Sequence, residues 1–296
     1  RVEPNRKAGE FMSRKKIGFI DLFIDEWHAN HFPQWLKTAH RGGEFELALA
    51  FELENRGGRS LVEWCHDNGV RPSGSIAEIV DRCDVLFILA PSNPEAHFTL
   101  AELPLQSGKP TYIDKPFAPD LATARKMFAL AERHHTPLFS SSALRFSEEL
   151  QAALKGIFAA SRPGLAVAAG GGRSFEEYGI HQLEMIVAAL GVGAHRAMQL
   201  EGGDNQYHLV IDYPDGRTAS ANFDAGFPFA INLSNGEHVL LASEVHRYFE
   251  NFTAAVLEFF ATGVPPVAQA ETLEIAALLE AGIKGKTRPG EWIELG

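Results

Sequence analysis

Segments with the pattern of buried strands alternate with helical segments through the first half of the chain, and this alternation restricts the fold most. The run Val85–Ala90 contains only apolar residues, which is typical of a strand buried on both faces of a parallel sheet. The sequence predicts further strands at 17–20, 45–51, 111–113 and 137–140, and helices at about 25–40, 60–68, 94–106 and 120–134. We therefore predict an α/β fold, a Rossmann-like doubly wound parallel sheet, over residues 13–144.

The pattern changes after residue 145. The sequence predicts helices at 147–158, 181–190 and 245–260, and strands at 165–169, 207–213, 217–223 and 239–241. Pro214-Asp215-Gly216 is a turn signal that indicates a hairpin, and Gly263 ends the last of these helices. We predict an α+β domain with a mainly antiparallel open sheet over residues 145–296, for substrate binding and homo-oligomerisation.

Composition limits the partners of the chain. It has 296 residues, of which 45% are hydrophobic, and this is enough for two domains. The formal net charge of −11 argues against nucleic acids and anionic membranes, which bind clustered lysine and arginine. Cys65 and Cys83 lack the spacing of metal ligands or of a disulfide framework, so we expect a cytoplasmic location. Residues 1–12 lack hydrophobic periodicity, and we expect a disordered leader outside the fold.

A lysine stands directly after the predicted strand at 111–113, in the sequence Asp114-Lys115-Pro116. Folds of this class bind their ligands at the carboxyl ends of the strands. Pro116 restricts the backbone of Lys115, so the ammonium group would be held in a fixed place. The motif alone is weak, because many strands end in a charged residue and a proline. We expect Lys115 to mark the ligand site.

Three separated motifs reinforce one another by their order and spacing. They are 84–93 with His97, then 108–110 running into 114–116, then Gly179-Ile180-His181 followed by Glu184. Together they resemble the glucose–fructose oxidoreductase / inositol dehydrogenase / MocA (Gfo/Idh/MocA) family, and 270–295 is similar to its last helix and strand. The resemblance implies an oxidoreductase that uses NAD or NADP to act on a hydroxyl or carbonyl group of a sugar, polyol or related small molecule.

The resemblance also assigns catalytic roles. Asp114-Lys115-Pro116 matches the Glu-Lys-Pro signature of the family, so Lys115 would lie between the nicotinamide ribose and the substrate hydroxyl. The Asp-x-x-x-His pair of the family falls on Glu177 and His181, so His181 would transfer the proton while Glu177 assists. An imidazole suits this role because its ordinary pKa lies near neutrality. The alternatives are a surface lysine and a structural histidine.

The segment after the first strand departs from the family pattern. Asp21, Phe23 and Glu26 replace the three glycines of Gly-x-Gly-x-x-Gly, where bare backbone approaches the pyrophosphate. A carboxylate repels a phosphate by about 1 kcal/mol at ~4 Å in water and by ~4 kcal/mol where it is partly screened from water. Asp25 is also a candidate N-cap of the next helix. Asp21 and Phe23 would line the cofactor site, with the usual binding of NAD (or NADP) impaired.

Four more residues complete the implied cofactor site. The resemblance places Pro91, Asn93 and His97 near the cofactor, although His97 also fits a packing or capping role. Glu52 matches the acid that bonds the ribose 2′-hydroxyl and favours NAD over NADP, and its alternative is a solvated strand end. A short segment before Glu177 predicts an open pocket, or one that a partner subunit completes.

Several alternatives remain open. His28 and His31 share a helix face beside Asp25 and Glu26, which raises a metal site, but the sequence has no His-Glu-x-x-His cluster and we expect no metal. The chain could also be a binding or regulatory protein that lost dinucleotide binding, or could reuse the pocket for cofactor-independent lyase, isomerase or hydrolase chemistry. The replaced glycines favour these two readings, whereas Lys115 and His181 favour the oxidoreductase and the cofactor-independent enzyme.

Overall fold

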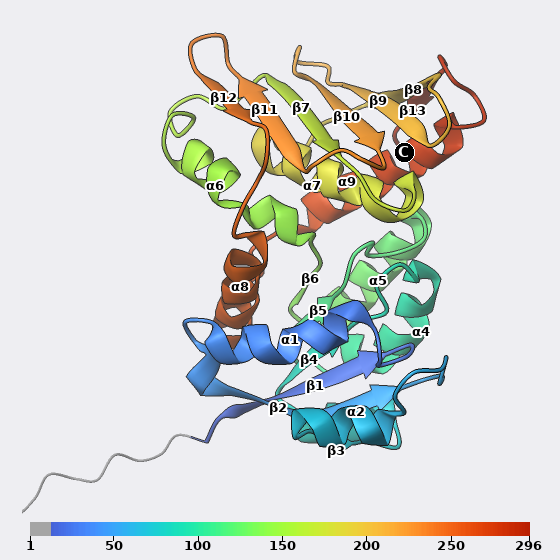
Figure 1. Ribbon diagram of the computed structural model, residues 1–296, viewed down its shortest axis with the longest axis vertical. Coiled ribbons are helices and arrows are strands. Elements are labelled where there is room, and N and C mark those ends of the chain that lie inside the picture. The colour runs from blue at the N-terminus through green and yellow to red at the C-terminus, as the bar shows by residue number, and fades with distance from the viewer. Residues whose placement is uncertain (1–12) are drawn as a thin grey trace, which may run out of the picture.

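The first half of the chain folds into a parallel sheet with helices on both faces (Figure 1). The computed structural model describes residues 13–296, so the predicted leader at 1–12 lies outside the described residues. The six strands are all parallel and have the order β3-β2-β1-β4-β5-β6, which is the doubly wound order of dinucleotide-binding domains. They are β1 (Lys15–Asp21), β2 (Phe45–Glu52), β3 (Arg71–Pro72), β4 (Val85–Ile88), β5 (Thr111–Ile113) and β6 (Leu138–Phe139).

The helices of this half begin at polar caps. Ser60 and Glu63 form a capping box, and the Asp120 carboxylate accepts the Thr123 amide at 2.7 Å. The helices are α1 (Trp27–Thr38), the short η1 (Gly42–Glu44), α2 (Leu61–Asn68), α3 (Ile76–Arg82), α4 (Pro94–Leu105) and α5 (Leu121–Arg133). The strand β3 and the helix α3 are absent from the prediction, because both are short and have little hydrophobic periodicity.

The second half forms a seven-stranded sheet in the order β12-β11-β7-β10-β9-β8-β13. Only β7 and β10 pair in parallel, so the predicted mainly antiparallel sheet is confirmed. The strands are β7 (Leu165–Gly170), β8 (Arg196–Leu200), β9 (Gln206–Asp212), β10 (Thr218–Asp224), β11 (Ala230–Ser234), β12 (Val239–Ala242) and β13 (Trp292–Glu294). Its other elements are η2 (Ala143–Phe146), α6 (Glu148–Lys155), α7 (Phe175–Leu190), α8 (Tyr248–Thr262) and α9 (Gln269–Gly285).

The helix α8 belongs to the second half of the chain but packs against the first sheet, beside α1 (Figure 1). The Phe260 ring lies 5.1 Å from the Phe87 ring of β4, and the Phe252 ring lies 5.4 Å from the Tyr112 ring of β5. Such aromatic pairs add about 0.5–1.5 kcal/mol to the free energy gained by burying the rings. The helix therefore closes one face of the parallel sheet and forms one side of the junction between the two sheets.

A buried ion pair joins three elements at this junction. The Arg145 side chain in η2 is 7% exposed, and its Nε donates to Glu184 Oε2 of α7 at 2.6 Å. Its Nη1 also pairs with Glu271 of α9, and Glu184 accepts the Ser142 amide at 3.1 Å. Arg145 thus has a structural role. Between residues 13 and 296, none of the helices combines the length and apolar character that crossing a membrane requires.

We expect Arg145→Ala to lower the free energy of unfolding by about 3–5 kcal/mol, because it leaves the Glu184 carboxylate buried without its cation. Arg82→Ala is the control, because Arg82 forms an exposed pair with Glu78 within α3 at 3.2 Å. That change should cost about 0–1 kcal/mol. Urea denaturation at neutral pH measures both, and equal losses would contradict the structural role of Arg145.

Candidate functional site

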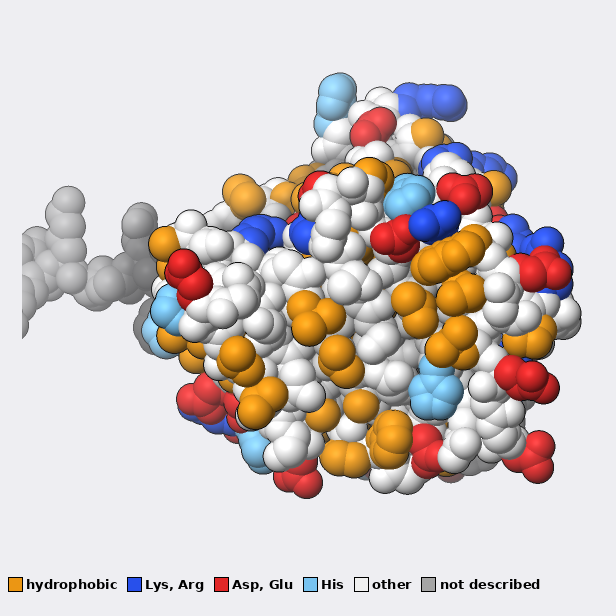
Figure 2. All heavy atoms as spheres, turned by 90° about the horizontal axis from the view of Figure 1, so that it is seen from above, with side chains coloured by type: hydrophobic (Ala, Val, Ile, Leu, Met, Phe, Trp, Pro, Cys, Tyr) orange, Lys and Arg blue, Asp and Glu red, His pale blue; other side chains and the backbone are white. Residues whose placement is uncertain are grey.

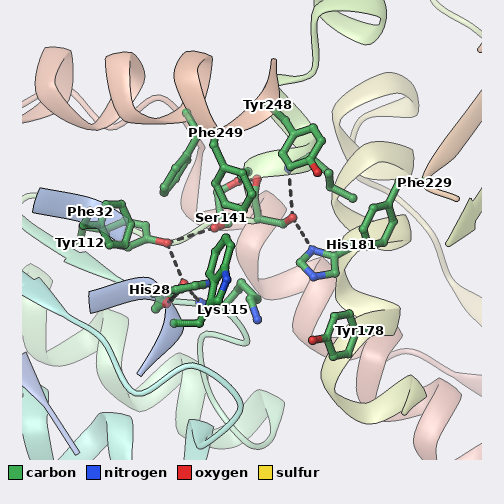
Figure 3. Close-up of a pocket in the computed structure, with 16 residues that line it drawn as sticks. His28, Phe32, Tyr112, Lys115, Ser141, Tyr178, His181, Phe229, Tyr248 and Phe249 are labelled. Atoms are coloured by element: carbon green, nitrogen blue, oxygen red, sulfur yellow. Dashed lines mark hydrogen bonds and ion pairs between the residues drawn. The ribbon is translucent and has the colours of Figure 1, made fainter. Parts of the chain in front are cut away.

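Two cavities meet where the strands of the parallel sheet end at their carboxyl termini. The first has a volume of about 260 Å³ and lies between the two sheets, and the second has a volume of about 480 Å³. Both are lined by Trp27 and His28 of α1, by Lys115 after β5, and by Tyr178 of α7. Figure 3 shows His28 and Lys115 on one side of the first cavity and His181 with Tyr178 on the other. The sheet edge where we expected the ligand therefore has a built pocket.

Lys115 is held between the two cavities. Its side chain is buried, and its Nζ lies 5.8 Å from the centre of the Tyr178 ring. The Lys115–Pro116 peptide bond is cis. Burial lowers the pKa of Lys115 from its ordinary value, although the carboxylates of Asp114 and Glu26 oppose this shift. An ammonium group in such surroundings can release or share a proton more readily than a surface lysine.

His181 of α7 lines the same first cavity as Lys115. Its Nδ1 lies 2.6 Å from Ser142 Oγ, and its ring packs edge-on against Tyr178 and Phe229. Burial lowers the pKa of His181 well below its ordinary value, and the nearby Lys115 ammonium lowers it further. The imidazole is therefore neutral at pH 7.

Within residues 13–296, Glu177 forms no hydrogen bond with His181 and pairs with an arginine. Its Oε2 lies 2.5 Å from Nη2 of Arg173, and Arg173 Nη2 also donates to Ser92 Oγ at 3.2 Å. The pair faces the second cavity instead of the first. Arg173 lies two residues before the start of α7, and its guanidinium reaches the carboxylate of Glu177 in the first turn of that helix.

The turn after β1 is filled by its own carboxylates. Asp21 is fully buried, and its Oδ1 accepts the amides of Leu22 at 2.7 Å and Ala90 at 3.0 Å. This ties the end of β1 to the loop after β4. Burial raises the pKa of Asp21 well above its ordinary value, and the Glu26 carboxylate raises it further. Asp21 is therefore a buried residue that holds this loop in place by hydrogen bonds.

Glu26, and not Asp25, is the N-cap of α1. Its carboxylate accepts the amide of His28 at 2.7 Å and also that of Ala29. The predicted cap, Asp25, instead binds Arg59 Nη2 at 2.7 Å. Burial raises the pKa of Glu26 to about 7. The amides that bind a pyrophosphate in dinucleotide-binding folds are thus already occupied by an anion of the chain.

Glu52 and Phe23 also differ from a usual cofactor site. Glu52 accepts the amides of Ile24 at 3.1 Å and Leu61 at 3.2 Å, so it holds two loops and is not a solvated strand end. Phe23 lines the second cavity, with the Arg56 guanidinium 5.1 Å from its ring. The described residues therefore do not fit a diphosphate in the usual place at the start of α1.

The loop after β4 contributes two of the residues that we expected to line a cofactor site. Pro91 and Asn93 line the second cavity, and Ala90 and Ser92 have φ angles of 67° and 64°. Non-glycine residues in this left-handed region are strained, and such strain concentrates at functional sites. His97 is fully buried, with its ring nitrogens 3.1 Å and 3.2 Å from two carbonyl oxygens, and it lines neither cavity.

His28 pairs with Asp114, a contact that the sequence did not predict. Their side chains, 86 positions apart in the chain, are in direct contact. Burial opposes ionisation of Asp114, but the neighbouring His28 and Lys115 outweigh it and hold its pKa at about 2. The only sequence signal for His28 was its place beside His31, whose ring instead stacks on Trp27 with the centroids 4.2 Å apart.

Comparison with known sequences supports the resemblance. The model of the oxidoreductase family with an NAD-binding Rossmann fold (GFO_IDH_MocA) matches residues 25–142. An uncharacterized oxidoreductase of Escherichia coli (strain K12), YhhX, is 24% identical over 154 residues. That match spans 45% of this chain and only 44% of the length of YhhX.

Solved structures extend the similarity over both sheets. GenD2 from gentamicin A biosynthesis, solved with NAD, has a TM-score of 0.77 and 14% identity, covering 99% of this chain and 100% of its own. The myo-inositol dehydrogenase of Lactobacillus casei, solved with NAD(H) and myo-inositol, has a TM-score of 0.77 and 12% identity, covering 96% and 97%. A probable dehydrogenase of Thermotoga maritima also has a TM-score of 0.77, with 15% identity, covering 95% and 98%. The predicted fold class and family resemblance are confirmed.

The raised pKa of Glu26 leads to a pH dependence of stability. Its folded-state pKa of about 7 lies above the ordinary value of 4.5, so the folded state binds this proton more tightly than the unfolded state. Relative to Glu26→Gln, the wild type should lose on the order of a few kcal/mol of unfolding free energy as the pH rises from 4.5 to 7. Urea denaturation of both proteins across this range is the measurement. A difference that grows with pH in favour of the wild type would contradict the buried carboxyl.

Proposed function

We propose that this chain is an oxidoreductase of small hydroxylated molecules, because residues 25–142 match the model of the oxidoreductase family with an NAD-binding Rossmann fold. The substrate would be a sugar, a polyol or a related compound with a hydroxyl or carbonyl group as the reacting centre. One observation carries the proposal, which is that Lys115 and His181 line the same cavity at the carboxyl ends of the parallel strands.

The walls of the first cavity support a cyclic polyol or sugar as the substrate class. Aromatic rings dominate the lining, and a flat ring of C–H groups can pack on them: Trp27, Phe32, Tyr178, Phe229, Tyr248 and Phe249. The polar groups are few and gathered, with Lys115, His181 and Ser142 available to hydroxyl groups. The volume of about 260 Å³ suits a small molecule and not a polymer.

Lys115 and His181 would divide the work on the reacting hydroxyl. The Lys115 ammonium would bind the oxygen and stabilise the negative charge that forms on it. His181 is neutral and has Nδ1 engaged with Ser142, which leaves Nε2 to form a hydrogen bond with a substrate hydroxyl. A nicotinamide ring, when bound, would accept or donate the hydride. Glu177 would act at the second cavity with Arg173, and not on His181.

We propose that NAD binds with its nicotinamide half in the second cavity, near Phe23, Pro91, Asn93 and Lys115. Its diphosphate would lie away from the start of α1, because Glu26 occupies those amides. An ionised carboxylate about 4 Å from a phosphate would weaken binding by about fivefold to a thousandfold. Glu52 still carries negative charge where a 2′-phosphate would lie, so NAD is favoured over NADP.

A second candidate function follows from the same Glu26 cap. A site that fills its own pyrophosphate place suits cofactor-independent lyase, isomerase or hydrolase chemistry in the first cavity. The lysine and histidine serve that chemistry equally well, since both groups bind and move protons without a redox partner. Binding of a dinucleotide therefore separates the two candidates.

We expect millimolar NAD to raise the melting temperature of the wild type, and NADP to raise it less. NAD should raise the melting temperature of Glu26→Gln more than that of the wild type, because the substitution removes a charge that repels the diphosphate. A ligand at 100 times its Kd stabilises the folded state by about 2.7 kcal/mol. If neither dinucleotide shifts the melting temperature of either protein, the oxidoreductase is excluded and the second candidate function stands.

Lys115→Ala should reduce turnover by at least about a hundredfold with an unchanged melting temperature.

We further propose that the outer face of the second sheet pairs with a second copy of the chain. Figure 2 views this face, where uncharged and hydrophobic side chains cover the centre and charged ones lie toward the rim. Val239 and Leu241 of β12 are 58% and 77% exposed, and the register places them beside Ser234 and Asn232 of β11. A broad uncharged face of this kind marks an interaction surface.

We expect the wild type to be an oligomer in solution and Leu241→Glu to shift it toward the monomer, because the change puts a charge in the proposed interface. Light scattering after size exclusion, over a range of concentrations, measures the mass. Leu103→Glu on α4 is the control, since Leu103 is 47% exposed in the other domain. A monomeric wild type, or an equal effect of both variants, would exclude this interface.

A further inference from the structure

The pair of His28 and Asp114 faces the first cavity and has no part in the proposed function. His28 is the second residue of α1, and Asp114 directly follows β5. Their side chains touch through Nδ1 of His28 and Oδ2 of Asp114. A carboxylate on one ring nitrogen fixes the tautomer and the orientation of an imidazole.

The Asp114 carboxylate is itself held in place. Its Oδ1 accepts the Tyr112 hydroxyl at 3.1 Å and the Lys115 amide at 2.8 Å. The side chain is 2% exposed, so water hardly reaches it. Three donors therefore fix the orientation of the carboxylate, and the carboxylate in turn fixes the orientation of the His28 ring.

The second ring nitrogen of His28 is available to a ligand. Within residues 13–296, Nε2 has no hydrogen-bond partner, whereas Nδ1 is engaged by Asp114. The side chain is 14% exposed and lines both cavities. The centres of the Trp27 and Phe32 rings lie 5.2 Å and 6.0 Å from the centre of the His28 ring, and both rings pack edge-on against it.

The two histidines of the first cavity differ in their support. His181 has only the Ser142 hydroxyl on Nδ1, and Glu177 is taken by Arg173. His28 has a buried, ionised carboxylate, which stabilises the imidazolium that forms when the ring takes a proton. His28 therefore has the carboxylate partner that orients an imidazole for proton transfer, and His181 lacks one.

We propose that His28, oriented by Asp114, accepts the proton of the reacting substrate hydroxyl. The substrate O–H bond breaks, the proton goes to Nε2 of His28, and the electron pair remains on the oxygen beside the Lys115 ammonium. His181 then binds a hydroxyl and is not the base. The inference rests on the proposed substrate class of hydroxylated molecules, and it holds for both candidate functions.

The test is His28→Gln, assayed with NAD and a panel of myo-inositol, scyllo-inositol and D-glucose. We expect kcat to fall by about a hundredfold or more while KM changes by only a few-fold, as for the loss of a general base. The decline of kcat toward low pH should also disappear. His66→Gln is the control, because its side chain is 89% exposed on α2.

Other groups near His28 titrate and need separate variants. They are Glu26 before α1, Asp114 and Lys115 after β5, and His181 on α7. Glu26→Gln should keep the decline of kcat toward low pH, and Asp114→Asn should shift it. Circular dichroism and melting confirm that each variant folds. An unchanged kcat and pH profile in folded His28→Gln would overturn the proposal.

A second measurement separates this inference from the proposed oxidoreductase. If the wild type turns over none of the panel, diethyl pyrocarbonate is used to modify histidines, and mass spectrometry follows each site. A panel compound at ten times its Kd should slow modification of His28 by about tenfold and leave His66 unaffected. Each compound is tested at up to about 100 mM, so that a weak ligand with a millimolar Kd also occupies the site. If none of them slows the modification of His28, its proposed role is overturned.

Discussion

The structure depends on one buried anion, the Asp114 carboxylate at the end of β5. An isolated charge in this place would be costly, so the fold supplies donors from two elements, His28 of α1 and the backbone of Lys115. Tyr112 adds a hydroxyl from the strand itself. The same contacts fix the start of α1 relative to the central strands. Packing of the first sheet and geometry of the pocket are therefore set by one electrostatic requirement.

The start of α1 reflects a second requirement, because the free backbone amides of the first helical turn need hydrogen-bond acceptors. In a dinucleotide-binding fold the ligand can supply the acceptor, whereas here Glu26 supplies it. The helix is complete without a ligand, and the cost is a carboxyl group whose pKa rises to about 7 in its buried place. The parallel sheet is the same in both cases, and only the source of the anion at the start of the helix differs.

Much of the fold followed from local patterns, and most of the site did not. The run at 85–90 and the hairpin signal at 214–216 predicted their elements because burial and turn geometry act over a few residues. The helix α7 begins at Phe175, six residues before the prediction, because Ser174 accepts the Glu177 amide and caps it there. The contact of His28 with Asp114 spans 86 positions and depends on strand order and helix placement, which no local pattern encodes. The pairing of Glu177 with Arg173 depends on the backbone path of the loop that leads into α7, which begins after Arg173.

The return of α8 to the first sheet means that the two halves of the chain are not two separable bodies. Phe87 and Tyr112 are covered by rings from residues that lie more than a hundred positions later in the sequence. A fragment ending at residue 144 would expose that face of the sheet to water and lose its hydrophobic stabilisation. In the wall of the first cavity, Phe249 stacks on Trp35 of α1 and Phe252 packs on Tyr112 of β5, whereas Tyr248 packs on the core of the second sheet. A ligand in this cavity would therefore be enclosed by the two halves of the chain together.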